Sequence, residues 1–572
     1  MWHATLLIAI LLAPLTTLHA ADAIVAFPGA EGPAAHATGG RGGEVYIVSN
    51  TNTEGPGSLA DAVSKPNRFI VFSTSGVIDL TQRKGRQAKG GKLEIRQPNL
   101  TIAGQTAPGD GVCLKGGTLV INASNVIVRH LRVRRGFVAD GDTGDAVELN
   151  PKDPTYVKPK FKGTDKDKTT ESKQESAKLE VVTDVLLDHV SASWATDENF
   201  TLSGHIDRVH AQHCLIAEAL DYTNPKQTPQ NHAFGSLFGG AASDSRVGMH
   251  HSIYAHHRRR TPQCSAGDGS GDPPVIVDFR NNIVYDSIEA LSHTGGHPIR
   301  LNFIANYYKM GPSSEAVLRG KWFTLQKSAD SRLHAAGNVV DGSPEATGDN
   351  WKGILYDKKI SFSPEMAMAR PFDVPAITTH TAEEAWERNL DESGATLPSR
   401  DAVDERVARQ VRTGTGTVIQ KETDLQESWP AYRSLPPLPD EDADGLPDFW
   451  ERQHGLNAQD ATDAKKIAAN GYANIEHYVN NTDPRGKSGP VVFASFQDSS
   501  FRVCRTGDTS GPLTVSFRIS DKESRTVIPA GHRFAVIPAP ASEAVLTLIG
   551  DQRGCPSRAL SQVASRVSAS SR

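Results

Sequence analysis

Five acidic side chains with a regular spacing lie between residues 440 and 451 of this 572-residue chain. They occupy the first, third, fifth, ninth and twelfth positions of a loop, and they are Asp440, Asp442, Asp444, Asp448 and Glu451. Gly445 at the sixth position permits a sharp turn, and Leu446 at the seventh offers its backbone carbonyl. An EF-hand loop binds calcium with oxygens at this spacing, whereas an ordinary acidic turn does not need the register. The sequence therefore predicts a Ca²⁺ site with a structural role.

Three other groups of charged residues follow short apolar runs earlier in the chain. They are the pair Asp197 and Glu198, the arginines Arg258, Arg259 and Arg260, and the Asp- and Gly-rich stretch that contains Asp142 and Asp145. On composition alone such a stretch is most often a solvated turn. Adjacent arginines can bind carboxylates as bidentate donors. These residues form a site only if the fold brings them together.

The apolar runs that precede these groups have the features of short strands. Each holds about four to eight β-branched or apolar residues and ends in Asn, Asp, His or Gly, which is typical of a strand closed by a turn. The runs lie at 99–107, 125–133, 184–198, 207–220, 246–263, 275–286, 299–309 and 332–340. Where no insertion intervenes, they recur roughly every 24 to 30 residues. The period predicts an all-β chain built on a right-handed parallel β-helix.

A parallel β-helix determines where charged side chains can gather. Each coil buries its apolar side chains and pairs its backbone with the coils on either side. Side chains at equivalent positions of successive coils therefore form a column on one outer face. A column of carboxylates and guanidiniums is suited to binding a long, charged polymer.

Several segments resemble the polysaccharide lyase family that contains the pectate lyases. Residues 185–193 (VLLDHVSAS) are similar to the family's strand with Asp-His-x-x-x-Ser, and Asp197–Glu198 stand where the family has a calcium-binding acid. Residues 260–263 (RTPQ) resemble its Arg-x-Pro-Arg segment, and residues 277–282 (VDFRNN) resemble the strand that follows. Residues 27–43 and 55–73 are similar to its first coil and capping helix. The order of these segments, within residues 24–345, makes the resemblance specific.

The resemblance implies an enzyme that cleaves polygalacturonate by calcium-dependent β-elimination. It implies Asp142, Asp145, Asp197 and Glu198 as Ca²⁺ ligands, Arg260 as the catalytic base, and His232, Lys226, Arg258 and Arg280 as substrate contacts. Two positions depart from the family pattern. Gln263 replaces the family's second arginine, and His232 stands near the place of a family lysine, with Lys226 only in the preceding loop.

Two other functions stay open. A guanidinium keeps its proton under most conditions, so the three arginines can instead bind carboxylates in a catalytically inactive polysaccharide-binding surface protein. A pectin hydrolase of the same fold needs an acid and a second carboxylate across the scissile bond, whereas Asp197 and Glu198 are adjacent and face opposite ways in a strand. Only a lyase releases an unsaturated product that absorbs ultraviolet light.

Histidines and one tryptophan in the strand region also invite interpretation. The histidines are His210, His213, His250, His251, His256 and His257. They lack the compact His and Cys spacing of a zinc site, which favours a hydrogen-bonded ladder. Trp194 lies beside the acids in the sequence and either stacks on a sugar or packs in the core.

The amino terminus and the net charge indicate an exported, soluble protein. The apolar run Leu6–Leu12 ends near Leu18-His-Ala20, a small-residue cleavage site, and the first 20 residues therefore read as a signal peptide. No later stretch is long and apolar enough for a membrane helix. With 61 basic and 66 acidic residues the formal charge is −5, which argues against a nucleic-acid partner. We expect a monomer that is periplasmic, secreted or bound at the cell surface.

Changes in composition divide the chain into five parts. They are a signal peptide (1–20), a β-helix catalytic domain (24–345), wrapping helices and a proline-rich linker (346–435), an EF-hand-like segment (436–484), and a β-sandwich-like domain with a tail (490–572), which faintly resembles a Calx-beta repeat. Short helices are expected at 57–63, with Ser58 as N-cap, at 381–390 and at 400–412. Cys113, Cys214 and Cys264 are expected to be buried, and pairing of Cys504 with Cys555 stays open.

Overall fold

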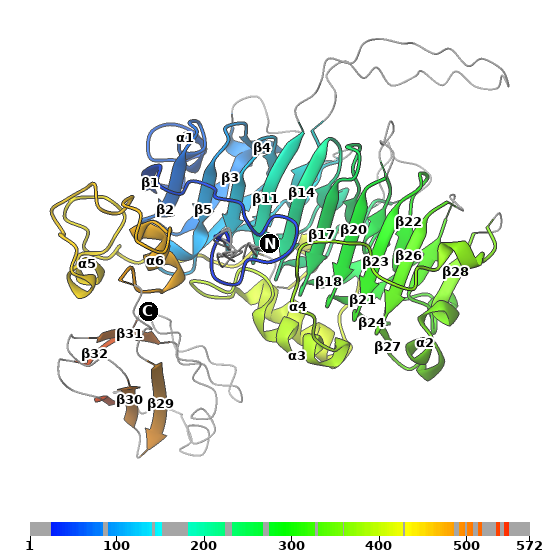
Figure 1. Ribbon diagram of the computed structural model, residues 1–572. Coiled ribbons are helices and arrows are strands. Elements are labelled where there is room, and N and C mark those ends of the chain that lie inside the picture. The colour runs from blue at the N-terminus through cyan, green and yellow to red at the C-terminus, as the bar shows by residue number, and fades with distance from the viewer. Residues whose placement is uncertain are drawn as a thin grey trace, which may run out of the picture.

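Three parallel sheets wound into a β-helix form the body of the protein (Figure 1). The computed structural model describes residues 24–83, 90–139, 143–151, 181–222, 231–266, 274–326, 330–357, 360–426 and 429–485, and the backbone of five strands beyond residue 490. The predicted signal peptide, Asp142, Lys226 and Cys555 lie outside the described residues. The predicted parallel β-helix is confirmed.

Each coil contributes one strand to each sheet in turn. The first sheet contains β1 (Glu44–Val48), β2 (Arg68–Phe72), β5 (Leu100–Ala103), β8 (Val126–Arg129), β11 (Val182–Asp188), β14 (Ile206–Gln212), β17 (Arg246–His250), β20 (Ile276–Arg280), β23 (Arg300–Ile304) and β26 (Arg332–Ala336). The second contains β3 (Gly76–Asp79), β6 (Val112–Lys115), β9 (Arg132–Arg134), β12 (Ser191–Ser193), β15 (Leu215–Ala217), β18 (Ile253–His257), β21 (Ile283–Ser287), β24 (Tyr307–Lys309) and β27 (Val339–Val340). The third contains β4 (Gly91–Ile95), β7 (Gly117–Ile121), β10 (Val147–Leu149), β13 (Glu198–Leu202), β16 (Phe234–Phe238), β19 (Gln263–Cys264), β22 (Ser292–Thr294), β25 (Phe323–Leu325) and β28 (Ile354–Tyr356). The solenoid thus continues past residue 345 to Tyr356.

Stacked apolar side chains hold the coils in register. In the first sheet Val185, Val209, Val247, Val277 and Leu301 pair from coil to coil, and all are fully buried. Burying a side chain of this size contributes about 1.5–3 kcal/mol. The β-branched runs in the sequence therefore form the continuous core of the solenoid.

Polar ladders mark the turns between the first and second sheets. Asn282, Asn306, Asn338 and Asn350 form one ladder, in which the side-chain oxygen of each of the last three accepts a hydrogen bond of 2.9–3.0 Å from the backbone N–H of the preceding asparagine. A second column consists of the stacked rings of His130, His189, His213 and His251, with centroids 4.5–5.3 Å apart. His250, His251 and His380 are linked by contacts of 2.8 and 2.9 Å between ring nitrogens. These contacts agree with the predicted histidine ladder.

Helices cover the second sheet and the first coil. The α-helices are α1 (Leu59–Ala62), α2 (Pro344–Gly348), α3 (Ala382–Glu392), α4 (Ala402–Thr413), α5 (Asp448–His454) and α6 (Asn474–Asn480). The 3₁₀ helices are η1 (Leu80–Gln82), η2 (Gly104–Thr106), η3 (Ala316–Leu318), η4 (Asn350–Gly353), η5 (Pro364–Met366) and η6 (Glu422–Asp424). Ser58 caps α1 and Thr381 forms a capping box with Glu384, as predicted. Leu390, Val407 and Val411 of α3 and α4 pack on β15, β18 and β21.

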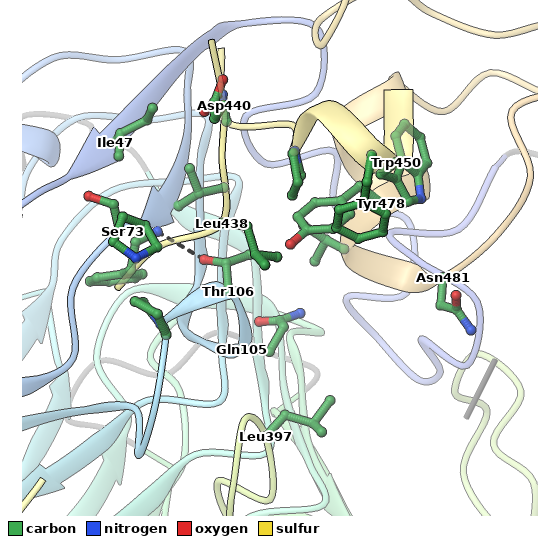
Figure 2. A pocket seen from close by; sticks show the side chains of 18 of the residues that line it. Ile47, Ser73, Gln105, Thr106, Leu397, Leu438, Asp440, Trp450, Tyr478 and Asn481 are labelled. Atoms are coloured by element: carbon green, nitrogen blue, oxygen red, sulfur yellow. Dashed lines mark hydrogen bonds between the residues drawn. The ribbon is translucent and has the colours of Figure 1, made fainter. Parts of the chain in front are cut away.

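The segment with the acidic loop docks on the first strands of the β-helix. Leu446, Trp450 and Ile475 pack against Phe69 and Val71 of β2. A cavity of about 730 Å³ lies between the docked segment and the first coils of the β-helix. Figure 2 shows Trp450 and Tyr478 on one side of this cavity and Ser73, Gln105 and Thr106 on the other.

Five antiparallel strands follow the docked segment. β29 (Val491–Gln497), β30 (Ser500–Thr506) and β33 (Glu543–Thr547) form one sheet, and β31 (Leu513–Phe517) pairs with β32 (Arg533–Ile537). Their packing as a sandwich stays a prediction. Cys113, Cys214 and Cys264 are buried free thiols, as expected. Among the described residues, no helix has the length and apolar character to span a membrane.

Candidate functional site

Acidic side chains from two neighbouring coils converge at the entrance to the third sheet. Asp145 precedes β10, Asp197 precedes β13, and Glu198 is the first residue of β13. Because β10 pairs with β13 in parallel, Asp145 lies beside Asp197 and Glu198, and one oxygen of each carboxylate lies within 4.8 Å of the others. Three of the four acids that the resemblance implied as Ca²⁺ ligands are thus brought together.

A polar cleft of about 350 Å³ contains these acids. Its lining residues are Gly91, Lys92, Thr118, Arg135, Thr143, Gly144, Asp145, Glu148, Asn150, Asp197, Glu198, Thr201 and Leu237. Lys92 and Arg135 bring positive charge to the cleft, and sequence reasoning missed both. Lys92 lies in β4 and Arg135 directly follows β9, in runs that carry no motif.

Burial and mutual repulsion control the protonation of the three acids. Burial raises the pKa of Asp145 to about 7, with further contributions from the charges of Asp197 and Glu148. Burial and the charge of Asp197 also raise the pKa of Glu198 well above its ordinary value. Burial would raise the pKa of Asp197 too, but hydrogen bonds with His232 and Glu198 hold it below the usual range. A hard divalent cation between these oxygens would allow all three groups to ionise, so the donor set fits calcium.

His232 and Phe234 lie on the next coil of the same face. The backbone N–H of Phe234 donates to the carbonyl of Asp197 at 3.3 Å, and His232 Nδ1 lies 3.1 Å from Asp197 Oδ1. The rings of His232 and Phe234 are 4.6 Å apart. His232 therefore flanks the acids, at one end of the column.

Arg260 returns toward the acids from the following coil. Its backbone has φ +64°, its guanidinium lies 4.0 Å from the centre of the Phe234 ring, and its Nη1 pairs with Glu198 Oε1. The guanidinium thus packs on the buried ring of Phe234, which lies on the coil between Arg260 and Glu198. Arg260 and the acids share one flank of the β-helix. The ring that supports Arg260 had no signal in the sequence beyond its place two residues after His232.

Other predicted site residues lie elsewhere or are engaged in different contacts. Arg258 lies between Asp221 and Glu289, with Nε 2.6 Å from Asp221 Oδ1, and the hydrogen bond to Asp221 raises the pKa of Arg258. Arg280 ends β20 in the first sheet, where it donates to Asp278 at 2.6 Å and to Thr379 at 3.0 Å. Neither arginine is brought to the acids.

Trp194 belongs to the core and not to the cleft. It is fully buried, and its Nε1 donates to Glu218 Oε2 at 2.9 Å. The structure therefore supports the packing alternative over stacking on a sugar.

The second set of predicted ligands lies in the docked segment. One oxygen from each of Asp440, Asp442 and Asp444 lies within 4.8 Å of the others, and the same holds for Asp444, Glu451 and Asp463. Burial, followed by the charges of Asp444, Asp442, Asp463 and Asp440, raises the pKa of Glu451 to about 8. Sequence reasoning missed Asp463.

The chain was compared with family models and with solved structures. No family model matches the chain. Among solved structures, the crystal structure of jun a 1, the major allergen from cedar pollen, has a TM-score of 0.41 at 14% identity over 64% of this chain and 92% of that chain. Pectate lyase II from Xanthomonas campestris has a TM-score of 0.39 at 13% identity over 65% of this chain and 99% of that chain.

Curated relatives match most of the chain. A probable pectate lyase C of Aspergillus flavus is 29% identical over 483 residues, which are 83% of this chain and 98% of that protein. A probable pectate lyase C of Aspergillus terreus is 31% identical over 485 residues, which are 82% of this chain and 96% of that protein. At that identity and coverage, the chain belongs to the pectate lyase family of polysaccharide lyases.

Proposed function

We propose that this protein is an exported, calcium-dependent lyase that cleaves polygalacturonate by β-elimination. The observation that carries the proposal is the position of Arg260 on the same flank as Asp145, Asp197 and Glu198. Export rests on the signal-like first 20 residues. The names of the curated relatives support pectate as the substrate.

The carboxylates of the cleft would hold the cation. Asp145, Asp197 and Glu198 offer oxygens from two coils, which suits the flexible geometry of calcium. A bound Ca²⁺ would withdraw charge from the substrate carboxylate and so acidify the neighbouring C5 proton. Lys92 and Arg135 line the same cleft and would attract a polyanion.

Arg260 would receive the C5 proton. β-Elimination breaks the C5–H and C4–O bonds and forms a C4–C5 double bond. A guanidinium usually keeps its proton, so Arg260 would first have to lose a proton to solvent before its neutral guanidine accepts the C5 proton, and the C4 oxygen would leave with a proton from water. The Phe234 ring fixes the guanidinium at 4.0 Å, which limits the conformational entropy that the side chain loses on binding.

His232 is proposed as a substrate contact at the place of the missing family lysine. Its contact with Asp197 at 3.1 Å orients the ring beside the cleft. A histidine ring can donate or accept a hydrogen bond, which suits contact with a sugar hydroxyl or carboxylate.

Hydrolysis fits this geometry less well. An inverting hydrolase separates its two carboxyl groups by about 6.5–9.5 Å to admit a water molecule, and a retaining one by about 5–5.5 Å. In the cleft the side chains of Asp197 and Glu198 are hydrogen-bonded to each other, so this pair leaves no room for a scissile bond between its carboxyl groups.

The test compares two arginine variants on polygalacturonate. Arg260→Lys keeps the charge but moves the nitrogen atoms, and we expect product absorbance in the ultraviolet to form at least about 100-fold more slowly. Arg246→Lys, on the first sheet beside Asp244, is the control and should keep the wild-type rate. Addition of a chelator should abolish absorbance, and calcium should restore it. Reducing ends without absorbance would instead show hydrolysis, and no product from the wild type would show a binding protein.

A further inference from the structure

The docked segment contains a cluster of buried carboxylate oxygens that the lyase chemistry does not use. Glu451 is fully buried, and neither of its side-chain oxygens has a hydrogen-bond partner among the described residues. Asp463 is 2% exposed and Asp444 is 5% exposed. Asp463 Oδ1 and Asp442 Oδ2 likewise have no partner in the described part of the chain. Burying a carboxylate without a hydrogen bond or an opposite charge costs free energy, so we expect a cation to bind these oxygens.

The nearby basic side chains already have partners. Arg452 pairs with Asp448 at 3.1 Å, Lys466 pairs with Asp460 at 2.8 Å, and both basic side chains are largely exposed. Neither basic side chain therefore neutralises the buried carboxylates.

The geometry of the loop fits one hard divalent cation. Asp444 belongs to both oxygen groups, since it lies within 4.8 Å of Asp440 and Asp442 on one side and of Glu451 and Asp463 on the other. Oxygens on opposite sides of a calcium ion are roughly 5 Å apart, and calcium takes about six to eight oxygens. The turn itself is fixed by Ala443 and Gly445, which have φ +59° and +92°.

The residue at the ninth loop position has a different use. Asp448 begins α5, where its Oδ1 accepts from the N–H of Glu441 at 2.8 Å and its Oδ2 pairs with Arg452. Its place is taken by Asp463, which approaches from outside the twelve-residue loop. Asp463 Oδ2 accepts from the N–H of Asn457 at 3.1 Å, whereas Oδ1 is buried without a partner among the described residues, and one of the two oxygens lies within 4.8 Å of Glu451 and Asp444.

We propose that Asp440, Asp442, Asp444, Glu451 and Asp463 bind a second calcium ion, with Asp463 in place of Asp448, and that this ion holds the segment on the β-helix. The link to the β-helix is direct. A Cβ added to Gly445 would lie 2.9 Å from Val45 and 3.1 Å from Val71, and the neighbouring Leu446 is fully buried against the first sheet. The cation therefore shapes the turn that touches β1 and β2.

The test is hydrogen–deuterium exchange of the full chain, measured by mass spectrometry over a calcium titration. We expect calcium to protect peptides that cover residues 440–466, and also those of β1 and β2. Asp463→Asn should raise the calcium concentration at half-protection by at least about tenfold, the lower end of what even an outer-shell change costs a metal site. Asp448→Asn is the matched control and should stay within about twofold of the wild type. Peptides of β11 to β15 serve as the folding control.

Three results would overturn the proposal. One is a wild type whose peptides 440–466 show no calcium-dependent protection. Another is an Asp463→Asn midpoint equal to that of the wild type. The third is a shift in Asp448→Asn without one in Asp463→Asn. If Asp463→Asn does not fold, Asp463→Glu, which keeps the charge but displaces the oxygen, replaces it with the same expected shift.

Discussion

Asp145→Asn should have opposite effects on stability with and without calcium. Burial raises the pKa of Asp145 from 3.8 to about 7, so the folded protein holds a proton that the unfolded chain has lost above pH 4. A raised folded-state pKa gives stability that is present below the unfolded pKa and is lost as pH rises through the folded pKa. At roughly 1.4 kcal/mol per pH unit, ionising Asp145 costs up to about 4 kcal/mol at pH 8. Its partial exposure reduces this to about 2–4 kcal/mol.

An asparagine has the same shape and never ionises. In calcium-free buffer at pH 8 the variant should therefore be more stable than the wild type, with a melting temperature several degrees higher, whereas at pH 4 the two should agree. With saturating calcium the order reverses, because the variant has lost an anionic ligand. Thermal unfolding followed by circular dichroism at both pH values measures this. Asp373→Asn, at an exposed position, is the control and should change neither value.

A variant that is less stable than the wild type in calcium-free buffer at pH 8 would refute the reasoning. So would a difference between the two proteins that does not depend on pH. Either result would mean that Asp145 is stabilised as an anion by Lys92 or Arg135, and that the cleft does not need a cation.

Two further predictions concern buried charge. Burial, together with the charge of Arg280, lowers the pKa of His210 to about 3. The contribution of His210 to the free energy of unfolding should therefore fall as the pH drops below the unfolded pKa of about 6.5, by about 2–3 kcal/mol between pH 6.5 and 4.5. Urea unfolding should show a smaller loss in His210→Met, and an equal loss would contradict the assignment. Arg134→Met should cost about 3–5 kcal/mol and expose α4 to hydrogen exchange, because the buried carboxylates of Asp401 and Asp404, each 2.8 Å from Arg134, would lose this cation. Asp401 would keep its contacts with Arg132 and Tyr432, whereas Asp404 would keep the neutral Ser191 hydroxyl. Unchanged exchange in α4 would contradict this.

The sequence predicted the β-helix because its signal is repeated in every coil. Strand runs such as 185–193 carry enough β-branched residues, and their turns enough Asn, Asp and His, to show the period without any long-range information. The resemblance to the pectate lyases implied Asp145, Asp197 and Arg260, and the parallel coils place these strand ends side by side. Local pattern and sequential topology agree in this part of the molecule.

Arg280 shows that the sequence does not predict which face of the β-helix a charged residue occupies. Each coil has strands in three sheets, and a charged residue at a strand end looks the same in the sequence whichever sheet it belongs to. Arg280 ends β20 of the first sheet, whereas Arg260 precedes β19 of the third. Only the lengths of the turns decide between the faces, and insertions obscure those lengths. Arg258 lies in the same turn as Arg260, and there it contacts Asp221 and Glu289 from the two neighbouring coils.

Asp448 and Asp463 show a different limit of prediction from sequence. Groups of the protein can compete with a metal ion for the same carboxylate. The spacing rule counts residues along a loop, but a carboxylate at the first position of a helix can also accept a hydrogen bond from the backbone and pair with a basic residue one turn later. Asp448 has both partners, Glu441 and Arg452, and it satisfies its oxygens without an ion. Asp463 has a backbone contact for one oxygen, and the other is buried without a partner among the described residues. A ligand is therefore better identified by the oxygens that the rest of the chain leaves unsatisfied than by its place in a motif.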